Sequence, residues 1–243
     1  MKEVEGKREC EVKYKLQNLL EESYFIEKIE RLGFKFKSNN LESDYTPDVE
    51  GFLCKKNGLM LRFRVLEGTD NDVLLTLKIK IKGNGFQDNY EIETLFSNFD
   101  EVKFQKINEK LYNAIKCKLS PDVKNLKDID SIRKYLKENS FTEHRMFTQK
   151  KRKEYIDSNQ RKITIDEFPK NIGKYLEIET ESPEQLFKIV QSLGLKKEQI
   201  EKKNYGEIIK EKQNALPEEQ RRTCIFIDEN EKKKKDTSRD TCF

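Results

Sequence analysis

The stretch Glu9-Cys10-Glu11-Val12-Lys13-Tyr14-Lys15 sets a pattern that several later segments of the chain repeat. Successive side chains of a β-strand point to opposite faces, so Glu9, Glu11 and Lys13 share one face. Every position on that face is charged, whereas an ordinary amphipathic strand carries a loose mixture of polar residues there. The face is therefore either a solvated sheet surface or the lining of an interior that holds charged ligands.

The 243-residue chain is poor in apolar residues and rich in charge. Hydrophobic residues make up 35% of it and charged residues 39%, with 49 Lys and Arg against 45 Asp and Glu. The length predicts one large domain or one domain with an extension. The net charge of +4 does not by itself indicate a nucleic-acid-binding protein. Without a long apolar run or a signal peptide, we expect a soluble, cytoplasmic protein.

Five scattered cysteines and a single histidine limit the chemistry that the chain can perform. The cysteine count is odd and no C-x-x-C pair occurs, which favours free thiols. His144 alone cannot supply a zinc site with several imidazole ligands, and we interpret it as a surface or barrel-edge residue. A metal site would therefore be built from carboxylates, which suit Mg²⁺ or Mn²⁺.

Hydrophobic periodicity predicts the order strand, helix, four or so strands, two helices, three strands and closing helices. Strand patterns occupy residues 9–15, 59–66, 73–82, 89–95, 146–155, 162–166 and 174–180, and helix patterns occupy 18–32, 100–120, 128–136 and 182–193. Asp100, Asp128 and Ser182 are predicted N-caps, and residues 46–48 a turn. This order indicates an α+β fold with a largely antiparallel sheet.

The C-terminal part of the chain has a different character. Beyond about residue 212 the periodicity is lost, and the sequence ends shortly after a run of four lysines at 232–235. We expect residues 213–243 to form a disordered tail with a short docking segment at 224–227. The lysine run is interpreted as solvated.

The charged strand faces are sorted by sign. Acidic pairs at i, i+2 are Glu9 with Glu11, Glu91 with Glu93, and Glu177 with Glu179, whereas basic pairs are Arg62 with Arg64, Lys78 with Lys80, and Lys150 with Arg152. A solubilising face has no reason to be sorted in this way. Cations along a groove can bind a chain of phosphates, and paired carboxylates can hold a divalent cation that bridges phosphate oxygens. We therefore favour charged faces that meet inside a barrel.

Eight short motifs along the chain match those of a known family in order. They are Glu9-x-Glu11-x-Lys13, Leu61-Arg62-Phe63-Arg64, Leu75-Thr76-Leu77-Lys78, Tyr90-Glu91-Ile92-Glu93, Lys150-x-Arg152-x-x-Tyr155, Ile163-Thr164-Ile165-Asp166, Gly173-Lys174-Tyr175-Leu176-Glu177-Ile178-Glu179 and Lys203-Asn204-Tyr205. The set resembles the CYTH superfamily, the triphosphate tunnel metalloenzymes. Its members include class IV adenylyl cyclases, thiamine triphosphatases and inorganic triphosphatases. Each motif is weak alone, but together they span roughly residues 3–212.

The resemblance implies a fold and a domain organisation. The expected fold is a closed antiparallel β-barrel, a triphosphate tunnel of about eight strands with flanking helices, over residues 1–212. Residues 97–142 form a longer helical insertion than is usual and would reshape the tunnel mouth. Lys78 also lacks the Gly-Pro that often follows in relatives, and the tail at 213–243 has no family counterpart.

The resemblance also implies roles for individual residues. Metal-binding roles fall on Glu9, Glu11, Glu91, Glu93, Asp166, Glu177 and Glu179. Catalytic and substrate-binding roles fall on Lys13, Arg62, Arg64, Lys78, Lys150 and Arg152, and further substrate-binding roles on Lys80 and Lys203. For Glu91, Glu93 and Asp166, orienting a basic neighbour is an open alternative to binding a metal.

The expected activity is the divalent-metal-dependent hydrolysis of inorganic or organic triphosphates. We favour hydrolysis because it needs no adenine pocket and no alignment of a ribose. A class IV adenylyl cyclase, which converts ATP to cyclic AMP and pyrophosphate, is the alternative with the same site. A second alternative is a non-catalytic module that binds polyphosphate or nucleotide.

The expected partner is a small molecule that contains a triphosphate, namely tripolyphosphate, thiamine triphosphate or ATP, with Mg²⁺ or Mn²⁺ as the cofactor. A membrane is not an expected partner. Few aromatic residues lie on the charged faces, which argues against an RNA-binding surface. The sequence leaves the oligomeric state open and is compatible with a homodimer.

Overall fold

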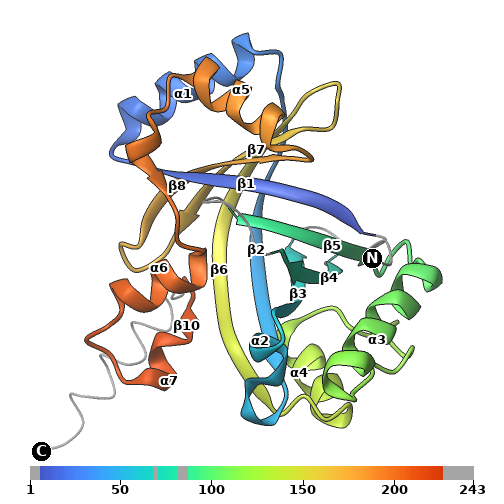
Figure 1. Cartoon of the computed structure of the whole chain (residues 1–243). Coiled ribbons are helices and arrows are strands. Elements are labelled where there is room, and N and C mark those ends of the chain that lie inside the picture. Colours follow the sequence, from blue (N-terminus) through green and yellow to red (C-terminus); the bar gives the residue numbers. More distant parts are fainter. Residues whose placement is uncertain (1–5, 68–70, 82–86, 227–243) are drawn as a thin grey trace, which may run out of the picture.

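The computed structural model describes residues 6–67, 71–81 and 87–226. Its centre is a ring of eight strands with helices around it (Figure 1). The ring strands are β1 (Lys7–Leu16), β2 (Lys35–Asp48), β3 (Leu59–Glu67), β4 (Asp72–Lys80), β5 (Gln87–Leu95), β6 (Glu143–Ile156), β7 (Lys162–Phe168) and β8 (Gly173–Thr180). They follow one another as β6-β2-β3-β4-β5-β1-β8-β7, and pairing of β7 with β6 closes the ring. All of these pairings are antiparallel, so the predicted fold class is confirmed.

Helices and short elements lie in the connections between the ring strands and in the segment that follows β8. They are α1 (Leu19–Arg31), η1 (Glu50–Phe52), α2 (Leu53–Lys56), α3 (Glu101–Ile115), α4 (Ile129–Glu138), α5 (Pro183–Leu193), η2 (Lys197–Gln199), β9 (Ile200–Glu201), α6 (Tyr205–Lys212), α7 (Glu218–Arg221) and β10 (Thr223–Cys224). Asp100, Asp128 and Ser182 accept hydrogen bonds from the first turns of α3, α4 and α5, as predicted. No helix in the described ranges has the length and apolar character needed to cross a membrane.

The apolar faces of the ring strands are covered from outside. Cys10, Val12 and Tyr14 of β1 pack in a cluster beneath α1 and α5, which lie side by side (Figure 1). A second cluster joins the outer faces of β3, β4 and β5 to α3 and α4. Because side chains alternate along a strand, covering the apolar face turns the charged face toward the inside of the ring.

The strand β2 corrects the predicted turn at residues 46–48. Residues 35–48 form one long strand that pairs with β6 on one side and β3 on the other. Pro47 lies where the register with β6 shifts, a position at which a missing backbone N–H is tolerated. The strand therefore continues through the proline and carries Glu42 and Asp44 into the ring, with Glu42 buried.

The C-terminal segment differs in part from the prediction, which places residues 213–243 in a disordered tail with a short docking segment at 224–227. Residues 213–226 include α7 and β10, and β10 pairs in parallel with β6 at Phe147 and Thr148. These partners lie beyond the part of β6 that pairs with β7, so β10 occupies a free stretch of sheet edge. Cys224 is fully buried there. Residue 82 of the predicted strand 73–82 and residues 227–243 lie outside the described residues.

One buried carboxylate fastens α1 to the ring. Glu22 is 4% exposed and accepts hydrogen bonds of 2.8 Å from Lys153 of β6 and Lys174 of β8. Burial alone would raise the pKa of Glu22, but the hydrogen bonds from the two lysines outweigh it and lower the pKa.

We expect Glu22→Gln to lower the free energy of unfolding by about 1–3 kcal/mol, because hydrogen bonds between charged groups are lost at a buried position. Urea denaturation followed by circular dichroism measures this change. The matched control is Glu27→Gln, an exposed residue of the same helix that pairs with Arg31. The control should change stability by less than about 0.5 kcal/mol. Equal effects of the two variants would contradict the assignment.

Candidate active site inside the ring

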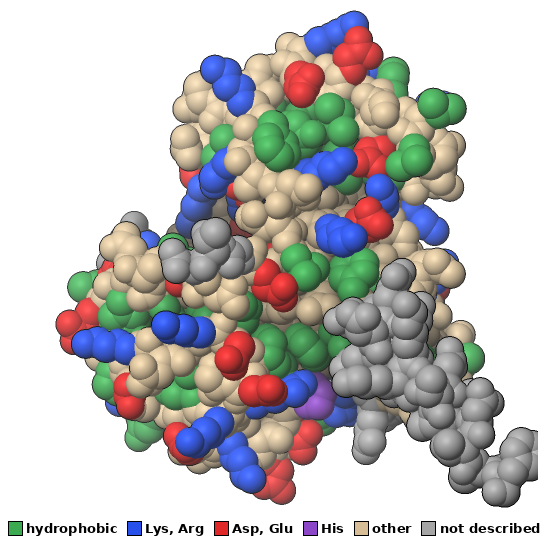
Figure 2. Space-filling model, turned by 180° about the vertical axis from the view of Figure 1, so that it is seen from behind, with side chains coloured by type: hydrophobic (Ala, Val, Ile, Leu, Met, Phe, Trp, Pro, Cys, Tyr) green, Lys and Arg blue, Asp and Glu red, His purple; other side chains and the backbone are tan. Residues whose placement is uncertain are grey.

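The ring brings most of the predicted site residues into one interior. Thirteen of them, from seven of the eight strands, take part in its ion pairs and charge clusters: Glu9, Glu11, Lys13, Arg62, Arg64, Lys78, Glu91, Glu93, Lys150, Arg152, Asp166, Glu177 and Glu179. Outside, basic and acidic side chains are interspersed over the face shown in Figure 2. Sorting of charge by sign is thus a property of the strands' inward faces.

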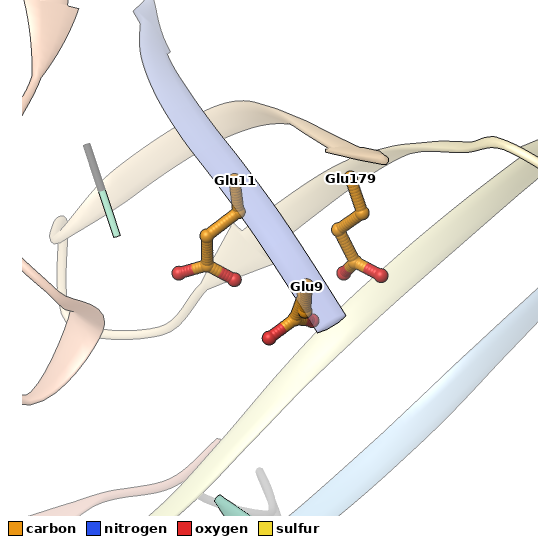
Figure 3. A group of neighbouring side chains, drawn as sticks. All are labelled: Glu9, Glu11 and Glu179. Atoms are coloured by element: carbon orange, nitrogen blue, oxygen red, sulfur yellow. The ribbon is translucent and has the colours of Figure 1, made fainter. Parts of the chain in front are cut away.

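Three carboxylates form a cluster at the junction of β1 and β8. Glu9, Glu11 and Glu179 each offer an oxygen, and the three oxygens lie within 4.8 Å of one another (Figure 3). Burial raises the pKa of all three carboxyl groups, and neighbouring carboxylates add to the effect, with Glu179 reaching about 7. Each of the three also pairs with a lysine: Glu9 with Lys78, Glu11 with Lys13, and Glu179 with Lys162. Three hard oxygen donors in this arrangement are suited to Mg²⁺ or Mn²⁺.

The other carboxylates near β8 are held in ion pairs with basic side chains. Glu177 lies 3.1 Å from the Lys13 ammonium and 3.0 Å from the Arg152 guanidinium. Asp166 accepts two 2.6 Å hydrogen bonds from Arg152 and one of 3.2 Å from Lys150. Although burial opposes it, these cations lower the pKa of both carboxyl groups, that of Glu177 strongly. Glu177 and Asp166 thus orient basic neighbours.

The carboxylates of β5 behave in the same way. Glu91 forms an ion pair with Lys78, which also lies 2.6 Å from Glu9. Glu93 accepts a 2.8 Å hydrogen bond from the Thr76 hydroxyl, and its carboxylate lies 3.7 Å from Arg62. Of the seven carboxylates predicted to bind metal, three therefore form one cluster, whereas Glu91, Glu93, Asp166 and Glu177 lie outside it.

Positive charge accumulates beside Lys150. This residue is 4% exposed and lies near both Arg152 and Arg64. Burial and the charge of Arg152 lower the pKa of Lys150, and the nearby carboxylates of Asp166 and Glu42 only partly offset this. The interior therefore contains a group of neighbouring cations, Lys150, Arg152 and Arg64, in addition to the carboxylate cluster.

The sequence analysis did not identify some of the charged residues that lie in the interior. Asp44 accepts hydrogen bonds of 2.6 and 2.9 Å from Arg64, and Glu42 lies 3.1 Å from the same guanidinium. Their i, i+2 spacing is the same signal that marks the other acidic strands, but the predicted turn at 46–48 obscured it. Lys162 also lies at the interior, 2.8 Å from Glu179.

Two predicted substrate-binding residues are not brought to this interior. Lys203 is exposed and forms an ion pair with Glu211 on the outside of α6. Lys80 is exposed at the end of β4. His144, predicted to lie at the surface or at the edge of the barrel, is partly buried and stacks on the ring of Tyr45.

The two glutamates of β8 should respond in opposite ways to loss of charge. Glu177→Gln removes one of the two carboxylates that pair with each of two buried cations, Lys13 and Arg152, so we expect the free energy of unfolding to fall by about 3–5 kcal/mol. Glu179→Gln relieves repulsion among carboxylates and should not lower stability. Urea unfolding at neutral pH in the presence of a metal chelator tests both variants. Equal destabilisation would contradict the proposed division of charge.

Solved structures similar to this chain are found, but the sequence comparisons give no match. No family model matches the chain, and no curated protein matches it either. PH1819 from Pyrococcus horikoshii has a similar structure, with 23% identity, a TM-score of 0.58, and coverage of 84% of this chain and 99% of that one. A "putative adenylate cyclase" from Vibrio parahaemolyticus has 19% identity, a TM-score of 0.58, and coverage of 84% and 98%.

A further P. horikoshii protein, PH1012, is similar over 82% of this chain and 98% of its own, with 22% identity and a TM-score of 0.56. These matches cover nearly the whole of each partner, so the shared region is the complete fold of those proteins. The chain therefore has the fold of these proteins.

Proposed function

We propose that the protein is a divalent-metal-dependent hydrolase of triphosphates, which bind within the ring. One observation carries the proposal. The interior encloses a cluster of three carboxylates that could hold a metal ion and, around Lys150, a group of buried cations that could bind a polyanion. A metal ion and a triphosphate bound together would use both.

Burial makes this argument stronger than the charge pattern alone. Lys13, Glu11 and Glu177 have side chains that are only 3–6% exposed. Transfer of such groups from water is unfavourable unless they pair with one another or with a ligand. On a solvated sheet face these side chains would be exposed to water. In an enclosed site they can be stabilised by pairing with one another or with a bound charged ligand. The inward orientation thus supports a binding role for the interior.

The donor set of the carboxylate cluster fits the expected metal. Glu9, Glu11 and Glu179 would hold Mg²⁺ or Mn²⁺, since these ions prefer carboxylate oxygens over nitrogen or sulfur ligands. When bound, such an ion would neutralise phosphate charge and polarise the bond that is broken.

The basic side chains would bind and align the phosphates. Arg64 and Arg152 present planar guanidinium groups, which can form paired hydrogen bonds with phosphate oxygens. Their orientation is fixed by Asp44 and Asp166 respectively, each of which accepts two hydrogen bonds from its arginine. Lys13, Lys78 and Lys150 would add positive charge along the same interior. Preorganised cations of this kind stabilise charge that develops during phosphoryl transfer.

An adenylyl cyclase is the second candidate. A protein of the same fold from V. parahaemolyticus is described as a "putative adenylate cyclase". The same interior could bind ATP, with attack by the ribose hydroxyl in place of water. The products separate the two activities, because hydrolysis releases orthophosphate whereas cyclisation yields cyclic AMP and pyrophosphate.

We expect orthophosphate release from tripolyphosphate, thiamine triphosphate or ATP in the presence of Mg²⁺ or Mn²⁺, and no release after chelation of the metal. Chromatographic separation of the products measures this. Formation of cyclic AMP from ATP would instead establish the cyclase. Binding of these compounds without any product would indicate the non-catalytic module.

We expect Glu9→Gln and Glu11→Gln each to reduce metal-dependent turnover by about 100-fold or more, because each removes a charge that would hold the ion. Glu167→Gln is the matched control, since this partly exposed glutamate of β7 contacts Lys174 on the outside of the ring. Steady-state kinetics and circular dichroism report activity and folding. Full activity in both cluster variants would refute the metal assignment.

A further inference from the structure

One part of the ring wall is not closed by the ring strands themselves. β6 pairs with β7 only over residues 151–156, where Lys151 lies opposite Glu167. Toward its N-terminal end, β6 continues to residue 143 without a partner from β7, although β2 accompanies it there on its other edge. The wall therefore has a gap between the N-terminal half of β6 and the turn that joins β7 to β8.

The segment that follows α6 lies across this gap, and Figure 1 shows its elements α7 and β10 beside β6. We call residues 213–226 the C-terminal strap. On one side, the backbone N–H of Phe147 in β6 donates a 2.7 Å hydrogen bond to the carbonyl oxygen of Arg222. On the other side, the ammonium group of Lys170 in the β7–β8 turn donates a 3.1 Å hydrogen bond to the carbonyl oxygen of Thr223. The C-terminal strap thus bridges the two borders of the gap.

Cys224 of the C-terminal strap completes the wall at the gap. It is fully buried and packs in one cluster with Met146 of β6 and Phe168 of β7. Its partner in the parallel pairing is Thr148. Because side chains alternate along a strand, Met146, Thr148 and Lys150 follow one another on the inward face of β6. The C-terminal strap therefore covers the wall beside Lys150.

The docked C-terminal strap leaves buried polar atoms unpaired. Gln213 is 5% exposed, and neither its amide nitrogen nor its amide oxygen has a hydrogen-bond partner among the residues that the structure describes. The same is true of the Nε atom of Arg221. Water would hydrogen-bond to all three atoms if the segment left the ring, so their burial opposes docking.

The strand pairing that holds the C-terminal strap is also short. β10 is two residues long, whereas β7, the shortest strand of the ring, has seven. Elements with few backbone pairings and unpaired polar groups open more readily than the core of a protein. The C-terminal strap is therefore attached more weakly than the ring strands are attached to one another.

We propose that residues 213–226 act as a releasable lid over the gap: the C-terminal strap detaches while the ring stays folded, and its detachment opens the wall beside Lys150. Opening and closing would control a lateral route to the charged interior, whatever reaction takes place there. The device thus goes beyond the proposed hydrolase and does not depend on it.

Alkylation of buried cysteines measures the opening in the intact chain. Cys10 in β1, Cys54 in α2 and Cys224 in the C-terminal strap are all 0% exposed, so each reacts with iodoacetamide only when its surroundings open. We expect Cys224 to react about 100-fold faster than the other two, which become accessible only when the ring or its covering helices unfold. Peptide mass spectrometry follows each thiol, with the rates in the urea-unfolded chain as the reference. Equal rates for the three thiols would overturn the inference.

Two variants should shift the opening in opposite directions. Gln213→Met replaces the unpaired amide with an apolar group of similar length, so alkylation of Cys224 should become about 10-fold slower. Gln149→Ala removes the side-chain oxygen that accepts a 2.9 Å hydrogen bond from the Phe226 N–H, so alkylation should become about 5-fold faster. Gln191→Met, at an exposed position of α5, is the matched control and should leave the rate unchanged. Shifts in the same direction, or none, would contradict weak docking.

Acetylation of Lys150 tests whether the C-terminal strap covers a route into the ring. Lys150 is 4% exposed, and its reaction with an N-hydroxysulfosuccinimide acetate ester should follow the rate of Cys224 alkylation in both variants. Lys153, whose side chain is 38% exposed on the outer face of β6, is the control and should react at a constant rate. Lys150 rates that do not follow Cys224 would overturn the inference and leave the proposed hydrolase intact. Absence of triphosphate turnover would refute the hydrolase without changing either modification rate.

Discussion

The structure depends on the enclosure of charge. Each ring strand places its apolar side under the outer helices, so the interior must accept the carboxylates, ammonium groups and guanidinium groups of the opposite side. Such groups are stable in an enclosed space only if they find partners. Arg152 shows how this condition is met, because Asp166 and Glu177 from two neighbouring strands both bind it. Ring closure brings these strands together, so fold and site form as one unit.

Pairing inside the ring is incomplete, and its defects are informative. Charges that serve only the fold would be expected to neutralise one another. Instead Glu9, Glu11 and Glu179 converge at one place although each also pairs with a lysine, and Lys150 lies beside two arginines as well as Asp166 and Glu42. Local departures from the best pairing are typical of sites that have to bind something else.

The alternation at Glu9, Glu11 and Lys13 was enough to predict an enclosed charged interior, because strand geometry has a period of two. The role of each carboxylate was not predictable in this way. Glu177 and Glu179 occupy equivalent positions on β8, yet Glu177 lies between Lys13 and Arg152, whereas Glu179 pairs with Lys162 and also lies in the cluster with Glu9 and Glu11. That difference arises from strands distant in the sequence. Asp44 was missed for a local reason, since Pro47 resembles a turn residue but lies at an irregularity within β2.

Closure of the ring has a consequence for biosynthesis. β1 lies between β5 and β8, so the first strand of the chain pairs with residues 174–180, more than 150 positions later. Contacts between such remote segments slow folding, because a long loop must close before they form. While the chain leaves the ribosome, the edge of β1 that will pair with β8 has no partner until most of the protein has been translated. A nascent chain of this architecture should therefore benefit from chaperones that shield an unpaired strand.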